Sequence, residues 1–284
     1  MKESLDLLTH LITLVFVVST MTATGLSLKL NEIIEPLKDR RLVLRSLLVN
    51  FVLVPLFALL IIKLLPLKES IATGLLLLAL APGEPVLPKL AKIAKVNVGF
   101  SVGLAVLLIV GTIFYVPLVF PLFVSGVEIN TFLIARELIV LMLLPLVFGL
   151  VLNARYEGVS KLLLPTLEQT SNITLILVTA LLLFVNFGHV VGLIGTFGIL
   201  AMLLLFASGY GAGYLFGGPD RDKRLVLAMG TPLRNIPAPL LIATQNFDDP
   251  NVAVMVVVAS VLLAAMLPVA GEMGRQSKKG TELI

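Results

Sequence analysis

The stretch PGEPVLPK at residues 82–89 and the stretch GTPLRNIPAP at residues 230–239 interrupt two apolar segments, each long enough to cross a bilayer. Each stretch combines several prolines with at least one charged residue. Proline lacks a backbone N–H and clashes with the preceding turn, so neither stretch can be regular helix. Breaks and charges inside a bilayer are tolerated where they face protein or a water-filled cavity. A pair of broken helices in two halves of a chain is typical of the central site of a secondary transporter.

Composition places the whole chain in a membrane. Hydrophobic residues make up 58% of its 284 residues and charged residues only 13%, with a mean hydropathy of +1.07. These values exclude an ordinary soluble domain. Long apolar runs without strict alternation favour helices over outer-membrane strands. Cysteine is missing, which excludes disulfides, thiolate metal sites and cysteine nucleophiles.

The apolar segments predict an all-α membrane protein with nine transmembrane helices of ordinary length. The third and eighth of these contain the two proline-rich breaks. The predicted helices cover residues 7–28, 42–65, 70–95, 97–124, 132–153, 162–185, 190–216, 224–246 and 251–269.

Basic residues predict the orientation. Lysine and arginine gather within residues 38–41, 92–95, 221–224 and 275–279, which all fall on one side of a nine-helix chain. The opposite side has few basic residues, and the loop at residues 248–249 has none. By the positive-inside rule, we expect a multi-pass protein of the cell (inner or plasma) membrane with its N-terminus outside and its C-terminus in the cytoplasm.

The spacing of the two breaks predicts an inverted repeat. Helices three and eight lie five apart, so they cross the membrane in opposite directions, and helices 1–4 would match helices 6–9 with helix 5 unpaired. Short sequence matches between the halves agree with this, although a chain rich in glycine, proline and valine can produce them by coincidence. The predicted units are residues 1–124 (first repeat), 125–160 (helix 5), 161–271 (second repeat) and 272–284 (cytoplasmic tail).

Four short motifs resemble the sodium/bile acid symporter family. They are MTATGLSL at residues 21–28, NFVLVP at 50–55, APG at 81–83 and RN at 234–235. The chain is similar to a nine-helix member, without the first helix of the ten-helix members. The resemblance implies a panel domain and a core domain, in which the two broken helices cross near the middle of the membrane and bind ligands.

The chain departs from this family where the resemblance implies sodium ligands. After the Pro-Gly pair the family continues Gly-Thr-Ala-Ser-Asn, whereas this chain continues from Glu84 to Pro88. A glutamine on the second helix becomes Asn50, and a family serine is kept as Ser101. The remaining implied ligand positions hold Leu87, Pro88, Ala105, Gly230 and Arg234. Hard cations need several oxygen ligands, preferably including a carboxylate, so we expect the sodium site to be degraded and no metal to be bound.

Charged residues in the two breaks could take the place of the sodium ion that the resemblance implies. Arg234 is a permanent cation, and Lys89 is a second one unless it snorkels to the cytoplasmic interface. Glu84 would pair with one of them, either to bind the substrate or as a purely structural pair, or it would carry a proton because burial disfavours a charged carboxylate. The positive charge left over, with helix N-termini aimed at the crossing, predicts an anionic substrate.

The candidate substrate-binding residues come from the two breaks and the helices beside them. They are Arg234, Asn235, Lys89, Glu84, Thr231, Asn50, Ser101, Gln169 and Asn172. Glu168, Gln169 and Asn172 share one helix face, so they would line the cavity or serve capping and interhelical contacts.

These features predict a secondary transporter of a small organic anion, a carboxylate, that works by alternating access and does not require sodium. Transport would be linked to protons through Glu84 or be passive. The alternatives are a sodium-coupled organic anion symporter and a channel or substrate-sensing membrane protein. The chain shows no catalytic pair or metal cluster typical of an enzyme. The expected partners are the anion and the lipid bilayer; scattered basic residues argue against nucleic acid.

Overall fold

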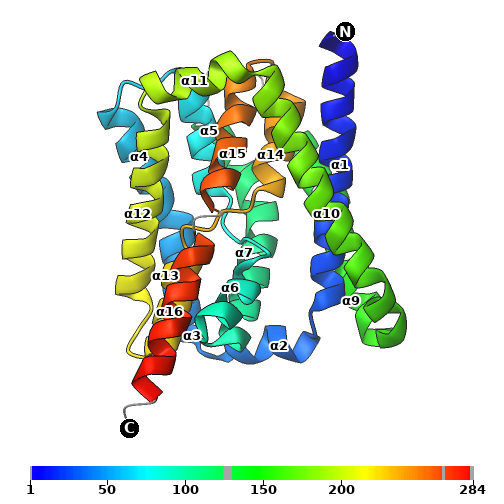
Figure 1. Ribbon diagram of the computed structural model, residues 1–284, viewed down its shortest axis with the longest axis vertical. Helices are drawn as coiled ribbons and strands as arrows, with labels where there is room; N and C mark the ends of the chain where they lie inside the picture. The colour runs from blue at the N-terminus through cyan, green and yellow to red at the C-terminus, as the bar shows by residue number, and fades with distance from the viewer. Residues whose placement is uncertain (1, 124–129, 264–265, 282–284) are drawn as a thin grey trace.

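The computed structural model describes residues 2–123, 130–263 and 266–281 (Figure 1). Within these ranges the chain forms helices and turns, together with one isolated backbone bridge between Pro82 and Arg234. The predicted all-α class is confirmed. The predicted boundary at residues 124–125 lies outside the described residues, as do residues 282–284 of the predicted tail.

Among the described residues, seven helical segments are long and apolar enough to cross a bilayer. They are formed by α1 (Lys2–Ser27), by α3 (Arg40–Leu48), η2 (Val49–Leu53) and α4 (Val54–Leu64), by α7 (Val98–Val119) and η3 (Phe120–Leu122), by α8 (Thr131–Leu138), η4 (Ile139–Leu143) and α9 (Leu144–Arg155), by α10 (Glu157–Val185), by α12 (Gly198–Phe216), and by α15 (Pro250–Leu263) with α16 (Met266–Thr281). Helix α16 continues through residues 272–281 of the predicted tail.

Two of these segments contain a wide π-helical turn next to a proline. η2 directly precedes α4, whose first turn contains Pro55, and η4 directly precedes α9, whose first turn contains Pro145. Proline cannot donate the usual hydrogen bond and crowds the preceding carbonyl, so a widened turn lets the helix continue.

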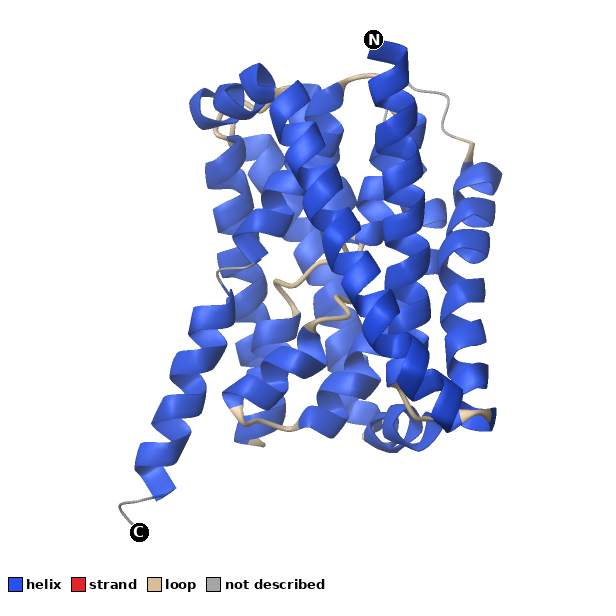
Figure 2. Cartoon of the chain, turned by 45° about the vertical axis from the view of Figure 1, so that its right-hand side comes forward, coloured by secondary structure: helices blue, strands red, loops and turns tan. Residues whose placement is uncertain are grey.

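Four shorter helices form two interrupted pairs. α5 (Glu69–Leu80) and α6 (Leu87–Ala94) flank the first break, and α13 (Arg221–Gly230) and α14 (Pro237–Asn246) flank the second. Both predicted breaks are present but shorter than predicted, because α6 and α14 begin with proline in the first turn, where its missing N–H is no loss. Figure 2 shows non-helical segments in the middle of the otherwise helical body.

The prediction of one helix over residues 190–216 is wrong. α11 (Phe187–Gly195) lies across the top of the molecule in Figure 1, and α12 starts anew at Gly198. Phe197 between them has a left-handed backbone with φ 59°. The remaining short elements, α2 (Leu30–Ile34) and η1 (Glu35–Lys38), connect α1 to α3 at the opposite end.

The helices pack in two groups. α1 lies against α9 and α10, and at the α1–α9 crossing Gly25 faces Gly149 so closely that a Cβ on Gly25 would come 2.2 Å from the Leu146 carbonyl oxygen. The other group contains both interrupted pairs, together with α4, α7, α12 and α15. Its buried apolar residues, such as Leu77, Leu241 and Val256, hold the breaks in place.

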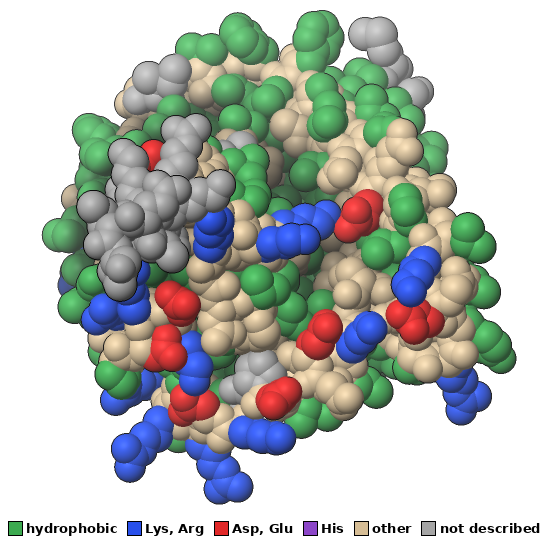
Figure 3. Space-filling model, turned by 60° about the horizontal axis from the view of Figure 1, so that its bottom comes forward, with side chains coloured by type: hydrophobic (Ala, Val, Ile, Leu, Met, Phe, Trp, Pro, Cys, Tyr) green, Lys and Arg blue, Asp and Glu red, His purple; other side chains and the backbone are tan. Residues whose placement is uncertain are grey.

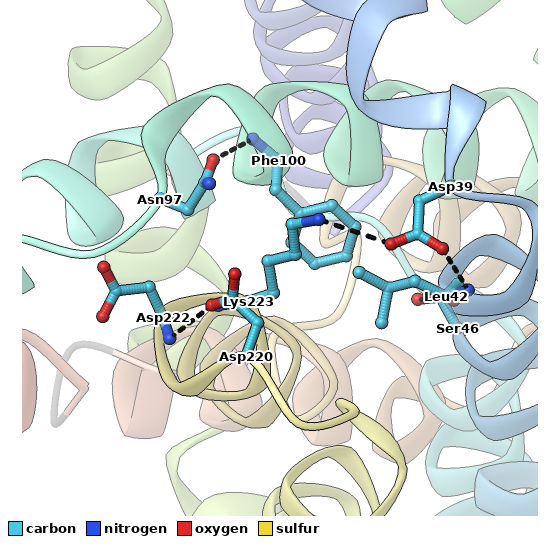
Figure 4. Close-up of polar contacts among 8 residues, drawn as sticks. All are labelled: Asp39, Leu42, Ser46, Asn97, Phe100, Asp220, Asp222 and Lys223. Atoms are coloured by element: carbon cyan, nitrogen blue, oxygen red, sulfur yellow. Dashed lines mark hydrogen bonds and ion pairs between the residues drawn. The ribbon is translucent and has the colours of Figure 1, made fainter.

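Capping contacts organise the end opposite to the N-terminus (Figure 4). Asp39, Asn97 and Asp220 accept hydrogen bonds from backbone N–H groups in the first turns of α3, α7 and α13. Asp39 also lies 3.3 Å from Lys223 Nζ and so connects α3 to α13. The Leu42 N–H, together with Lys223, holds the pKa of Asp39 below its usual value.

Candidate functional site at the crossing of the broken helices

The two breaks cross through backbone contacts. Pro82 and Arg234 form an antiparallel bridge, and Asn235 N–H donates to the Ala81 carbonyl at 2.8 Å. Gly83 has φ 98°, and a Cβ there would come 2.5 Å from Ile109 N, so glycine is required. Thr112 Oγ1 on α7 donates to the Pro82 carbonyl at 2.6 Å. These contacts satisfy backbone groups that the breaks leave without helical partners.

A cavity of about 260 Å³ lies beside this crossing. Its wall combines α1 and α10 with the first break, α6 and the start of α14. The lining residues are Phe16, Thr20, Ala23, Thr24, Ser27, Glu84, Pro85, Val86, Lys89, Leu90, Glu168, Ser171, Asn172, Leu175, Ile236, Ser260 and Leu267. A space-filling view from the end opposite to the N-terminus shows a recess with charged side chains beside it (Figure 3).

The charged groups of the cavity do not pair as expected from the sequence. Neither Lys89 nor Arg234 forms an ion pair with Glu84 within the described residues. Lys89 Nζ instead lies 2.8 Å from Glu168 Oε1 on α10. Glu84 Oε2 accepts a hydrogen bond from Ile236 N–H at the start of α14, at 3.3 Å. A helix N-terminus attracts a carboxylate, which explains this preference.

Arg234 is buried at the crossing and is not among the residues that line the cavity. Its side chain is 1% exposed, and Nη1 donates to the Ala79 carbonyl at 3.3 Å. That carbonyl belongs to the last turn of α5, where helical carbonyls lack partners and attract cations. The second guanidinium nitrogen, Nη2, has no hydrogen-bond partner among the described atoms.

Four other predicted site residues are buried away from the cavity lining. Asn50 Nδ2 donates to the Ser46 carbonyl at 3.0 Å and reaches Thr231 Oγ1 at 3.5 Å. Asn235 Oδ1 accepts from Ala238 N–H at 3.1 Å and caps α14. Ser101 Oγ donates to the Val98 carbonyl at 2.6 Å. The hydrogen bonds of these side chains connect neighbouring parts of the chain around the crossing.

The cavity brings together Glu84, Lys89 and Asn172 from the predicted set, whereas the exposed Gln169 is not among its lining residues. Sequence reasoning missed a row of hydroxyl groups on α1, at Thr20, Thr24 and Ser27. Their spacing of four and three residues places them on one helix face, and this spacing in the sequence could have predicted a polar face on α1. Thr20 Oγ1 also contacts Ser171 Oγ on α10 at 2.5 Å.

Comparison with known proteins identifies the family. A model of the Sodium Bile acid symporter family matches residues 13–207. The chain belongs to this family. It is 26% identical over 253 residues to the probable sodium/metabolite cotransporter BASS1, chloroplastic, of Arabidopsis thaliana, covering 88% of this chain and 63% of the relative. It is 24% identical over 249 residues to the protein of the same name from Oryza sativa subsp. japonica, and the match covers 85% of this chain and 60% of the relative.

The chain therefore spans less than two thirds of the length of these curated relatives. The resemblance seen in the sequence is confirmed, as is the prediction of a multi-pass membrane protein. Both relatives are named chloroplastic.

The positions at which the family resemblance implies sodium ligands are mostly apolar and closely packed in this structure. A Cβ on Gly230 would come 2.8 Å from Leu87 Cδ2, so the Leu87 side chain occupies the space that a glutamate at position 230 would need. Leu87, Leu104 and Ala105 belong to one buried apolar cluster. Asn50 Oδ1 is the one buried side-chain oxygen without a hydrogen-bond partner among the described residues. A hard cation needs several such oxygens.

Proposed function

We propose that this protein is a secondary transporter of a small organic anion, and that the substrate binds in the cavity beside the crossing. The observation that carries the proposal is the position of this cavity, whose wall combines α1 and α10 with the first break and the start of α14. The cavity volume of about 260 Å³ lies just below the usual range of small-molecule sites, which is about 300 to 1,000 Å³. This size favours a small metabolite over a steroid.

We further propose nine membrane crossings in an inverted repeat. The seven long segments and the two interrupted pairs would each cross once, with residues 1–124 matching residues 161–271. The group of α1, α8, α9 and α10 would be the panel domain, and the group with the interrupted pairs the core domain. The N-terminus would lie outside the cell and the C-terminus in the cytoplasm, in the inner or plasma membrane.

Alternating access would move these two groups against each other. Lys89 and Glu168 join them beside the cavity. Near the opposite end, the Gln245 amide of α14 lies 2.6 and 2.7 Å from the two carboxylate oxygens of Glu137 on α8. In the proposed orientation the second contact closes the outer side, and the recess in Figure 3 faces the cytoplasm. The structure would then represent an inward-facing state.

The charges of the cavity support coupling to protons. Its lining contains one cation, Lys89, and two acids, Glu84 and Glu168, so an anion arriving alone would meet net negative charge. Protonation of Glu84 would remove one negative charge and weaken the hydrogen bond from Ile236 N–H. That N–H, at the start of α14, and Lys89 would then receive the substrate carboxylate. The hydroxyl groups of Thr20, Thr24 and Ser27 would bind its polar substituents.

We also propose that transport does not require sodium. Leu87 against Gly230 and the apolar surroundings of Ala105 leave too few oxygen ligands at the implied positions. The alternative is a sodium-coupled symporter, which the names of both relatives favour.

Uptake into proteoliposomes tests these proposals. Purified protein would be reconstituted and offered radiolabelled 2-keto, hydroxy and dicarboxylic acids, in potassium or sodium buffer, with or without an inward proton gradient. We expect saturable uptake of one carboxylate class, equal in both buffers and faster with the gradient. Uptake indistinguishable from that of protein-free liposomes for every carboxylate would contradict an anion transporter. Saturable stimulation by millimolar sodium would favour the sodium-coupled alternative.

A further inference from the structure

A second cavity of about 260 Å³ lies at the end of the molecule opposite to the N-terminus. It shares no lining residue with the first cavity and is built from the turn between α6 and α7, from α12, from the start of α13 and from α16. Its lining residues are Ala94, Lys95, Val96, Tyr210, Tyr214, Arg221, Asp222, Arg224, Leu225 and Met273.

The charges around this cavity are unbalanced. Lys95, Arg221 and Arg224 are cations, and Asp222 is the one acid in the lining. The ion pairs found within the described residues involve other side chains. The neighbouring Lys223 is turned away, because it pairs with Asp39 on α3 (Figure 4). The lining therefore carries three cations against one acid.

The Arg224 side chain and the Lys95 backbone are held in defined positions. The Arg224 guanidinium lies over the Tyr214 ring, 4.9 Å from its centroid, and its Nε is buried without a hydrogen-bond partner. Stacking on an aromatic ring orients the planar donor group before a ligand arrives. Lys95 ends α6 in a left-handed conformation with φ 56°, and its N–H donates to the carbonyls of Ala91 and Lys92.

Two of the backbone N–H groups at the N-terminus of α13 already have a partner within the chain. Asp220 Oδ1 already accepts from the N–H groups of Asp222 and Lys223, at 2.9 and 3.1 Å (Figure 4). An anion in the cavity would therefore be bound by side chains. Two guanidinium groups and an ammonium group are the donors that suit a phosphate, which offers several charged oxygens in different directions.

We propose that this cavity binds a ligand with a net negative phosphate group. Lys95, Arg221 and Arg224 would bind the phosphate, and Asp222 and the two tyrosine hydroxyls would accept or donate hydrogen bonds to hydroxyl groups on the same ligand. The phosphate belongs either to the head group of an anionic lipid or to a soluble compound. In both cases the ligand would connect the end of α6 to α13, which are halves of the two broken helices.

Thermal unfolding of the full chain in a neutral detergent tests this proposal. The probes are dioleoylphosphatidylglycerol, with phosphate-free dioleoylglycerol as its control, and inorganic phosphate, with chloride at matched ionic strength as its control. The variants are Arg221→Gln and Arg224→Gln, with Arg41→Gln as a matched control, because Arg41 is exposed at the same end and does not line the cavity. Arg221 is also exposed, so its substitution leaves the fold intact even if Arg224→Gln does not.

We expect one of the two phosphate probes to raise the melting temperature saturably in the wild type and in Arg41→Gln. Arg221→Gln should weaken the apparent affinity about tenfold or more, the effect of one charge-assisted hydrogen bond. A response to phosphatidylglycerol alone identifies a lipid head group, and a response to inorganic phosphate identifies a soluble ligand. If neither probe stabilises the wild type, or if Arg221→Gln responds as Arg41→Gln does, the proposal is wrong.

Discussion

Lys89 and Glu168 lie 2.8 Å apart, between Nζ and Oε1, and join the first broken helix to α10 across the edge of the cavity. Their side chains are 62% and 36% exposed. An ion pair with this exposure contributes at most about 1 kcal/mol to stability, because water screens it. Because it joins two helix groups that would move against each other, we expect it to matter for transport more than for folding.

The first prediction concerns this pair. Lys89→Gln should reduce substrate affinity about tenfold or more, because the cavity loses its cation, while the melting temperature changes little. Lys161→Gln is the matched control, since Lys161 pairs with Glu157 on the exposed surface of α10. Binding to purified protein and unfolding in detergent measure the two effects. Equal affinity in Lys89→Gln and Lys161→Gln would exclude Lys89 from the substrate site.

The second prediction concerns the space between Leu87 and Gly230. Gly230→Glu alone should destabilise the protein by about 1 to 3 kcal/mol, as overpacking of a buried site does, because its Cβ would come 2.8 Å from Leu87 Cδ2. Combining it with Leu87→Ser removes the clash and adds two oxygen-bearing side chains. The double variant should melt at a higher temperature in sodium than in potassium, whereas the wild type should not distinguish them. A sodium-dependent shift in the wild type would mean that backbone carbonyls, Asn50 and Ser101 already suffice for a site.

The third prediction concerns Glu84. Glu84→Gln keeps the side chain's size but cannot gain or lose a proton, so uptake should no longer respond to a pH gradient. The control is Glu157→Gln, which removes a carboxylate outside the cavity lining. Uptake by proteoliposomes with imposed gradients measures the response. Gradient-driven uptake that persists in Glu84→Gln would assign proton coupling to another group.

The fourth prediction concerns topology. Asp248 lies in the loop between α14 and α15, and Lys38 lies between α2 and α3; both are exposed. Because the chain has no cysteine, Asp248→Cys and Lys38→Cys each introduce a single label site. A membrane-impermeant maleimide applied to intact cells should label the first variant, and the second only after the cells are opened. Labelling of both in intact cells would refute the nine-crossing arrangement.

The fifth prediction concerns the cap of α3. Asp39→Ala should lower the free energy of unfolding by about 1 kcal/mol near pH 7, as loss of an N-cap does. The pKa of Asp39 is lowered in the folded protein, chiefly by the Leu42 N–H, so its contribution is complete above the unfolded pKa of about 3.9 and is lost as the pH falls below that value. The difference between wild type and Asp39→Ala should therefore shrink in acid. A difference that stays constant from pH 7 to pH 3 would contradict a role for the charged cap.

The sequence by itself determined the membrane class, the helical fold, the two breaks and the family. Each of these follows from local chemistry: a long apolar run must form helix in lipid, and Pro82, Pro85 and Pro88 cannot all lie inside a regular one. The breaks proved shorter than predicted because proline is compatible with the first turn of a helix, and both α6 and α14 use it there.

Only the tertiary structure decided which polar groups meet. In the sequence, Glu84, Lys89 and Arg234 formed one set of charges that could be paired in several ways. In the fold, α10 brings Glu168 to Lys89, the start of α14 brings an N–H to Glu84, and the end of α5 brings a carbonyl to Arg234. In each case the two partners are more than 70 residues apart in the sequence. Two of the contacts also use the end of a helix, whose direction is set by the crossing of the two breaks. Local sequence cannot specify such contacts, because they depend on how whole helices are oriented and packed.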